Sequence, residues 1–340
     1  MTIVRRVLMV VSLLAVMGTM RTSLANAAPL LHRRTFALSV LKRYSPQGFY
    51  IVHTYEHTPW SYRLGDHSIQ FGKANFMDFV PGHTRLSVIT ALGTAVHEST
   101  HNFSRKLSWL LLSKSKRPWI SSLAVPIRIG EICLVRLTPW FPSAEIAPLI
   151  PNAVRDLRFS TYVSPSNPDQ STQQIGIYGL LDEFNAYYHG THTAVDLYGY
   201  FAHRAATSPA DWLAWIQSVE PVISARGQFK IFILASLIWA RQHHPARYAG
   251  FLANHEAVQA FLKTDAGWVR LLSRYKKLKA RLVAHLRREG QKVSEGARFF
   301  TIGTCGVGTA RQSVTACRKV LDSPRFVRME GRLEKAAETH

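Results

Sequence analysis

The feature of this chain that most limits its possible folds is an apolar stretch at residues 84–112 with the spacing of a long helix. Thr84 stands at its start, where an N-cap residue is expected. Between residues 85 and 103 only Arg85 and Glu98 carry a charge, so we expect the helix to lie inside a domain. Apolar side chains recur along it with the helical period of about 3.6 residues: Leu86, Ile89, Leu92, Val96 and Phe103.

The same stretch contains His97-Glu98-Ser99-Thr100-His101. Residues four apart lie on one face of a helix, so His97 and His101 can place two imidazole nitrogens on one metal ion. Glu98 then lies beside the metal without having to bind it. A general base needs this position to take a proton from a water held by zinc. We therefore expect Zn²⁺ at His97 and His101, with Glu98 as the catalytic base.

A catalytic zinc normally takes three protein ligands and leaves the fourth position to water. The residues that follow His101 contain neither the glycine nor the third histidine that the metzincin class places there. A second helix is predicted from Ile175 through Tyr188, ending at Gly190. It carries Glu183 in an apolar and aromatic setting, where an unpaired carboxylate would be costly. We expect Glu183 to be the third ligand.

Other residues could supply the third ligand instead. One turn after Glu183, the small Ala186 would let the two helices approach closely. This favours Glu183, but the sequence also leaves four alternatives open: His189, His192, Glu131 and Asp182.

His97-Glu98-x-x-His101, followed by a helical Glu183-x-x-Ala186, resembles the zincin metallopeptidases of the glutamate-ligand type, the gluzincins. The resemblance covers only these two helices. It implies a zincin-like fold, zinc bound by His97, His101 and Glu183, and peptide-bond hydrolysis with Glu98 as general base.

The pattern departs from thermolysin, where the glutamate lies closer to the histidines and an aspartate four residues later supports a zinc-bound histidine. Here Tyr187 stands at that position. The candidates for the supporting partner are Asp182 and Asn185.

Further roles follow from the resemblance and from proximity. Four residues are candidates to donate a hydrogen bond to the oxyanion of a tetrahedral intermediate: His189, His192, Tyr187 and Tyr188. In zincins an edge strand before the active-site helix binds the substrate backbone. Residues 68–80 are in the right place for such a strand, although an ordinary strand and turn would give the same pattern.

The N-terminus has the pattern of a secretory signal peptide. Arg5 and Arg6 precede an apolar run at residues 7–17, and Ala25-Asn26-Ala27 supplies the small residues of a cleavage site. We expect cleavage near Ala27 and export to the periplasm, the envelope or the extracellular space. The formal charge of +21 favours anionic partners, and for an exported chain these are envelope surfaces rather than nucleic acid.

The fold class we expect is α+β and mainly helical. A zincin-like domain would span residues 28–290, with early strands at 49–55 and 68–71, irregular structure at 123–170 and helices from 208 to 288. Residues 28–44 could be a pro-segment or, on the simpler interpretation, an N-terminal helix. The apolar run at 229–240 suits a buried helix rather than a membrane span.

Residues 291–340 are predicted to form an appendage closed by a disulfide between Cys305 and Cys317, since an exported chain meets an oxidising compartment. Cys133, in an apolar run, is expected to be a buried thiol.

A basic amphipathic helix at residues 268–289 allows two interpretations. It could pack its apolar stripe on the core with a solvated basic face, or it could dock on an anionic lipid or wall polymer.

The sequence thus predicts a secreted zinc-dependent peptidase acting on a peptide or protein substrate. Two alternatives remain: a non-catalytic envelope-binding protein on a zincin scaffold, and a zinc amidase that acts on cell-wall peptides.

Overall fold

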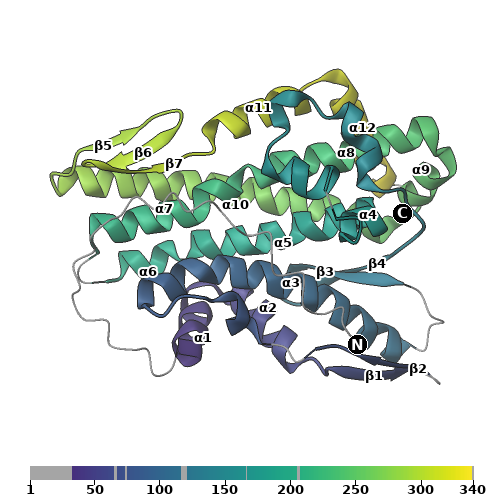
Figure 1. Ribbon diagram of the computed structural model, residues 1–340, viewed down its shortest axis with the longest axis horizontal. Coiled ribbons are helices and arrows are strands. Elements are labelled where there is room, and N and C mark those ends of the chain that lie inside the picture. Colours follow the sequence, from purple (N-terminus) through teal and green to yellow (C-terminus); the bar gives the residue numbers. More distant parts are fainter. Residues whose placement is uncertain are drawn as a thin grey trace.

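The computed structural model describes residues 33–64, 67–72, 75–115, 121–165, 167–204 and 207–338. The predicted signal peptide, residues 1–27, lies outside the described residues. The remainder is mainly helical with small antiparallel sheets, which confirms the expected α+β, mainly helical fold class (Figure 1).

Helix α3 (Arg85–Ser115) is the long apolar helix that the sequence predicts. Its first turn is capped reciprocally: Thr84 Oγ1 accepts from the Ser87 backbone N–H at 3.1 Å, and Ser87 Oγ accepts from the Thr84 N–H at 3.0 Å. Val88, Leu92 and Val96 are fully buried, which fixes α3 inside the fold.

Helix α5 (Ile177–Asp196) is buried along most of its length and packs against α3. It runs beyond Gly190, so the predicted end of this helix is wrong. A Cβ atom on Gly190 would lie 2.8 Å from the carbonyl oxygen of Gly93 and 3.0 Å from Cβ of His97. Gly190 therefore does not end α5; its lack of a side chain allows α3 and α5 to approach each other closely.

Two helices begin the described chain. Helix α1 (Arg33–Tyr44) fits the N-terminal helix expected within residues 28–44. Residues 49–55, predicted as a strand, lie instead in α2 (Pro46–His57). Pro46 stands in the first turn of α2, where proline is favoured, and Gly48, Ile51, Val52 and Tyr55 are buried at helical spacing. Packing thus overrides the strand propensity of this segment.

The sheets are short antiparallel hairpins. Strand β2 overlaps the predicted strand at 68–71, whereas β3 and β4 form a hairpin in a region predicted to be irregular. The first two hairpins are β1 (Ser61–Leu64) with β2 (His67–Gln70), and β3 (Ser122–Arg128) with β4 (Glu131–Arg136). Between them and α5 lie short helical turns: η1 (Phe76–Phe79), η2 (Ser143–Leu149), η3 (Asn152–Val154), the π-helical η4 (Phe159–Val163) and α4 (Ser171–Gln174).

The second half is helical, as predicted. It comprises α6 (Tyr198–Ala202), α7 (Pro209–Ile223), α8 (Ala225–His243), α9 (Pro245–Leu252) and α10 (His255–Arg288). Among the described residues one helical stretch, Pro209–His243, is long and apolar enough to span a membrane by length and composition, and 67% of its most apolar window is buried. The run at 229–240 is part of the core, where Phe229, Phe232 and Leu234 are fully buried.

Helix α10 packs its apolar stripe on the core, as the simpler interpretation of residues 268–289 expects. Trp268, Leu271 and Leu282 on this stripe are buried. Two of its basic side chains also serve the fold, because Arg274 pairs with Asp196 and Lys279 with Glu220. The apolar face of α10 is therefore occupied by the protein itself.

The C-terminal region forms a three-stranded sheet and two helices. These are β5 (Val293–Glu295), β6 (Phe299–Ile302), β7 (Cys305–Gly308), α11 (Arg311–Leu321) and α12 (Pro324–Glu338). Glu220 of α7 attaches this region to the core. Its buried carboxylate accepts hydrogen bonds from the Ala310 backbone N–H at 3.0 Å and from Lys279 Nζ at 2.8 Å.

The predicted disulfide between Cys305 and Cys317 is not formed, since both residues are free thiols. Cys305 lies in β7 opposite Ile302, whereas Cys317 is buried on α11 against Gly227 of α8. The strand and the helix thus hold the two sulfurs in different environments. Burial raises the pKa of the Cys317 thiol to about 12. Cys133 is buried, as expected.

Candidate metal centre

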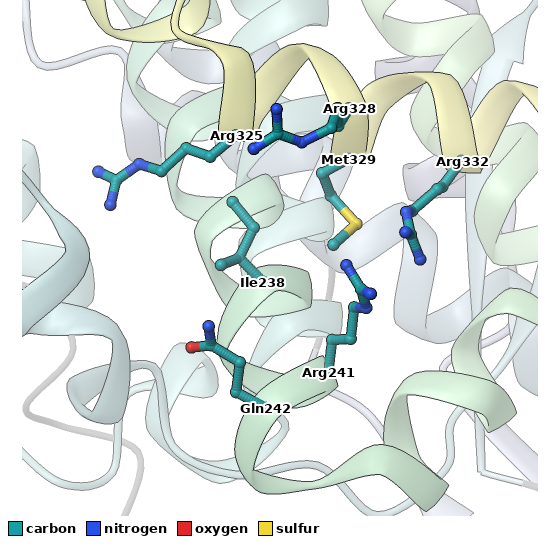
Figure 2. A pocket seen from close by; sticks show the side chains of 7 residues that line it. All are labelled: Ile238, Arg241, Gln242, Arg325, Arg328, Met329 and Arg332. Atoms are coloured by element: carbon teal, nitrogen blue, oxygen red, sulfur yellow. The ribbon is translucent and has the colours of Figure 1, made fainter.

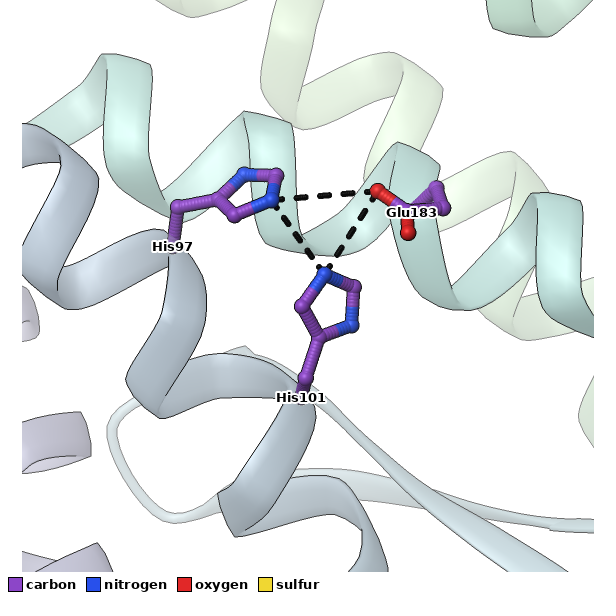
Figure 3. A group of neighbouring side chains, drawn as sticks. All are labelled: His97, His101 and Glu183. Carbon is purple, nitrogen blue, oxygen red and sulfur yellow. Dashed lines mark hydrogen bonds and ion pairs between the residues drawn. The ribbon is translucent and has the colours of Figure 1, made fainter. Parts of the chain in front are cut away.

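Helices α3 and α5 bring His97, His101 and Glu183 together. The two histidines lie one turn apart on the face of α3 that packs against α5, and Glu183 faces them from α5 (Figure 3). The close approach at Gly93 and Gly190 lies beside this group, because a Cβ on Gly190 would meet His97. The helix spacing that the glycines permit thus sets the distance between the histidines and the glutamate.

Three atoms converge within this group. The two histidine Nε2 atoms are 3.2 Å apart, and Glu183 Oε2 lies 3.7 Å from Nε2 of His97 and 3.5 Å from Nε2 of His101. A triangle with these sides has its centre about 2.0 Å from each corner, which matches Zn–N and Zn–O bond lengths of about 2.0–2.2 Å. The donor set and its geometry therefore fit a zinc ion.

The same atoms have unmet electrostatic needs. Glu183 is only 8% exposed, and its Oε2 is buried without a hydrogen-bond partner among the described residues. Its distances to the two histidine nitrogens exceed hydrogen-bond length. A buried carboxylate oxygen without a partner is costly, and a cation at the centre of the triangle would satisfy it.

Each histidine is oriented from α5. Nδ1 of His101 donates a hydrogen bond to Oδ2 of Asp182 at 2.7 Å, which leaves Nε2 facing Glu183. His97 is hydrogen-bonded to the backbone carbonyl of Ala186. Of the two candidates for the residue that supports a histidine, Asp182 and Asn185, it is Asp182 that contacts His101. Asn185 instead donates to the Pro126 carbonyl at 2.9 Å.

The two histidines differ in basicity. Burial, followed by the neighbouring His101, lowers the pKa of His97 to about 3. Burial alone would also lower the pKa of His101, but the carboxylates of Glu183 and Asp182 outweigh it and raise this pKa well above its ordinary value. The metal-free group therefore holds its proton on His101, in the place where a metal cation would sit.

Glu98 lines a cavity of about 780 Å³ beside His97. Burial raises the pKa of its carboxyl above the ordinary value. A carboxylate with a raised pKa is a stronger base, so Glu98 is suited to accept a proton from a water molecule in this cavity.

The cavity lies between α3, α5, α7, the segment around η4 and the C-terminal region. The last of these contributes Gly308, Thr309, Ala310 and Ser313 to its wall. Residues 291–340, predicted as an appendage, thus help to form the candidate site. The buried Glu220 of α7 holds this part of the wall, because its carboxylate accepts a hydrogen bond from the Ala310 backbone N–H.

Two residues of the cavity were missed by sequence reasoning. Tyr162 and Arg158 lie in the proline-rich region before α5, where no periodic pattern singles them out. The Tyr162 hydroxyl lies 3.3 Å from that of Tyr187, whose ring packs edge-on against His97 at 4.5 Å. The Arg158 guanidinium lies 4.9 Å from the centre of the Tyr187 ring.

These side chains offer hydrogen-bond donors. Burial, followed by the charge of Glu183, raises the pKa of Tyr162 well above its ordinary value, so its hydroxyl keeps the proton. Tyr187 was among the predicted oxyanion donors, and it is the one of the four that lines the cavity.

The other predicted candidates lie elsewhere. His189 is buried and donates from Nε2 to the Pro126 carbonyl at 2.8 Å, and His192 pairs with Asp196 at 3.0 Å. Tyr188 packs against Trp268. Glu131, the remaining alternative ligand, lies on the β3–β4 hairpin and pairs with Arg128 and with Lys263 of α10.

Residues 68–80, predicted as a substrate-binding edge strand, contribute no described residue to the cavity. Strand β2 ends at Gln70 and pairs with β1, and η1 follows at Phe76–Phe79. The segment contains an ordinary short hairpin strand and a helical turn.

Comparisons with known proteins give no match: no family model, no curated protein and no solved structure is significantly similar to this chain.

Proposed function

We propose that this protein is a zinc-dependent peptidase of the glutamate-ligand zincin type. The observation that carries the proposal is the convergence of two histidine Nε2 atoms and Glu183 Oε2 around a point about 2.0 Å from each. Asp182, which orients His101, adds the carboxylate–histidine arrangement common to zinc sites. His97, His101 and Glu183 would hold the metal.

A bound zinc ion would polarise the substrate carbonyl and make a nearby water more acidic. The Glu98 carboxylate would take the proton from that water and transfer it to the leaving amine nitrogen. The hydroxyls of Tyr162 and Tyr187 would donate hydrogen bonds to the carbonyl oxygen as negative charge develops on it. These roles follow from the positions of the side chains in one cavity.

The cavity favours a chain-like substrate with both apolar and polar groups. Its wall combines apolar side chains such as Leu157 and Val222 with the hydroxyls of Thr161 and Ser218. Peptides have this mixture of groups. An amidase acting on wall peptides would use the same residues, and only the substrate distinguishes it from a general peptidase.

The test is hydrolysis of a fluorogenic peptide library by the zinc-loaded protein and by Glu98→Gln. Loss of a general base lowers turnover by about 10²–10⁴-fold, and the zinc content should stay unchanged. Glu289→Gln is the matched control, since Glu289 is exposed beyond the end of α10 and far from the cavity lining.

Equal hydrolysis by Glu98→Gln and the wild type would refute the role of Glu98. If neither hydrolyses unlinked peptides, the same pair is assayed on cross-linked wall peptides. Cleavage there that requires Glu98 assigns the amidase. Absence of cleavage with zinc bound favours the non-catalytic envelope-binding protein.

A further inference from the structure

A second cavity lies between α8 and α12 and shares no lining residue with the cavity beside His97. Its volume is about 370 Å³. Four of its seven lining residues are arginines and none is acidic; the lining consists of Ile238, Arg241, Gln242, Arg325, Arg328, Met329 and Arg332 (Figure 2). We refer to it as the arginine cavity.

Helix stability does not explain the arginines on α12. Arg325, Arg328, Met329 and Arg332 follow the spacing i, i+3, i+4 and i+7, so they share the side of α12 that lines the cavity. The buried face of α12 is apolar and consists of Phe326, Met329 and Leu333, so the arginines are exposed side chains that flank this face. Arg325 and Arg328 also stand in the first turns of α12, where the helix dipole disfavours cations.

The positive charges of this cavity lack internal partners. Within the described part of the chain, Arg241, Arg328 and Arg332 form no ion pair or hydrogen bond, and Figure 2 shows Arg241 and Arg332 reaching toward one another from α8 and α12. Arg325 donates to the Leu149 carbonyl at 3.0 Å, which is a neutral partner.

Two carboxylates, on α12 and η2, pair with residues that do not line the cavity. Glu330 pairs with Lys230, and Glu145 accepts from His244 Nε2 and Trp239 Nε1, both at 2.9 Å. The exposed guanidinium groups of Arg241, Arg328 and Arg332 therefore present positive charge that no described carboxylate pairs with.

We propose that the arginine cavity binds a phosphate group. Guanidinium groups recognise phosphate oxygens through paired N–H donors, and several arginines around one concave surface suit a compact group of two or more negative charges. Gln242 adds an amide donor at the same wall. The phosphate can belong to a small soluble compound or to a lipid headgroup, since both present the same oxygens.

The test uses inorganic pyrophosphate as the soluble probe, measured by calorimetry in buffered 150 mM NaCl. The full chain should bind one pyrophosphate, and Arg241→Ala/Arg332→Ala should weaken binding by about tenfold or more. The matched control is Arg287→Ala/Arg288→Ala, which removes the same charge at the exposed end of α10 and should change affinity by less than about twofold.

A lipid source is tested with vesicles of phosphatidylcholine that contain phosphatidic acid, a phosphomonoester, in parallel with pure phosphatidylcholine. If the wild type sediments with the phosphatidic acid vesicles and Arg241→Ala/Arg332→Ala does not, the phosphate belongs to a membrane headgroup. Binding of pyrophosphate alone would assign a soluble phosphate compound. Arg241→Lys/Arg332→Lys keeps the charge and should still bind less tightly than the wild type, because lysine lacks the planar pair of donors.

Absence of binding to both pyrophosphate and phosphatidic acid would overturn the proposal. An equal loss of affinity in the alanine pair and in the Arg287/Arg288 control would do the same, because it would show diffuse attraction by net charge. Each variant changes exposed side chains only, so circular dichroism should confirm an unchanged fold.

Discussion

Nδ1 of His101 donates a hydrogen bond to Oδ2 of Asp182, 2.7 Å away on the neighbouring helix. Asp182 is adjacent in sequence to Glu183, so one segment of α5 both orients a histidine of α3 and supplies a carboxylate to it. The bond fixes the tautomer of His101 that leaves Nε2 free for a metal ion.

This relationship predicts the effect of Asp182→Asn. The amide removes the negative charge that supports His101, so zinc affinity should fall about 10–100-fold with the fold retained. Competition with a chromogenic chelator measures the change. Asp169→Asn, at an exposed position away from the cavity, serves as the control and should bind zinc as the wild type does. Unchanged affinity in Asp182→Asn would contradict the supporting role.

Zinc binding should release a proton. The pKa of His101 is raised well above its ordinary value by Glu183 and Asp182, which outweigh burial, so the metal-free protein holds a proton on His101 at pH 7. Zinc must displace it, and about one proton should leave per ion bound. Zinc affinity should accordingly rise with pH. Calorimetry in two buffers of different ionisation enthalpy counts the protons, and a count of zero would be inconsistent with this assignment.

His189 should make stability depend on pH. Burial lowers its pKa in the folded protein to about 3, whereas an unfolded histidine has a pKa of about 6.5. Between these values the unfolded chain binds the extra proton, so His189 favours the folded state above pH 6.5 and its contribution falls as the pH decreases toward 3.

By pH 5 the loss due to His189 should reach about 2 kcal/mol relative to neutral pH. Urea unfolding of the metal-free wild type and of His189→Gln at pH 7.5 and 5 measures this loss. Between the two pH values the free energy of unfolding should fall by about 2 kcal/mol less in His189→Gln than in the wild type. The contributions of His97 and His101 are present in both proteins and cancel in the difference. Parallel pH profiles would show that His189 is not the buried neutral group described above.

Gly190 is not a candidate ligand, yet Gly190→Ala should disturb the metal centre. The new Cβ would meet the Gly93 carbonyl oxygen at 2.8 Å and Cβ of His97 at 3.0 Å. Relief of this overlap separates α3 from α5, with an expected loss of about 1–3 kcal/mol in the free energy of unfolding and weaker zinc binding. Gly250→Ala on α9 has open space around it and should be neutral or slightly stabilising. Wild-type zinc affinity in Gly190→Ala would show that helix spacing does not set the site.

Much of the candidate site was predictable from local patterns. The period of residues 84–112 and the cap at Thr84 define α3, and a four-residue spacing on a helix is enough to pair His97 with His101. Glu183 could be predicted because a carboxylate in an apolar helix needs a partner. The end of that helix could not be predicted, because Gly190 does not terminate it. Gly190 instead allows α5 to approach Gly93 of α3, which is distant in the sequence.

Other features depend on long-range packing that a sequence pattern does not show. Phe49 to Val52 favour a strand locally, yet α2 forms because Ile51, Val52 and Tyr55 share a helical face buried in the core. The cavity residues Arg158 and Tyr162 come from the short helical turn η4 and its N-cap, whose position is set by contacts with α5, α7 and α8.

Zinc content of the purified chain, measured after zinc loading and dialysis beside His101→Ala, Glu183→Ala and Glu98→Gln, tests the central claim most directly. We predict about one zinc ion per chain in the wild type and in Glu98→Gln, and loss of zinc in the other two variants. A wild-type chain without zinc would contradict the metal centre, and zinc retained in Glu183→Ala would contradict the assignment of the third ligand.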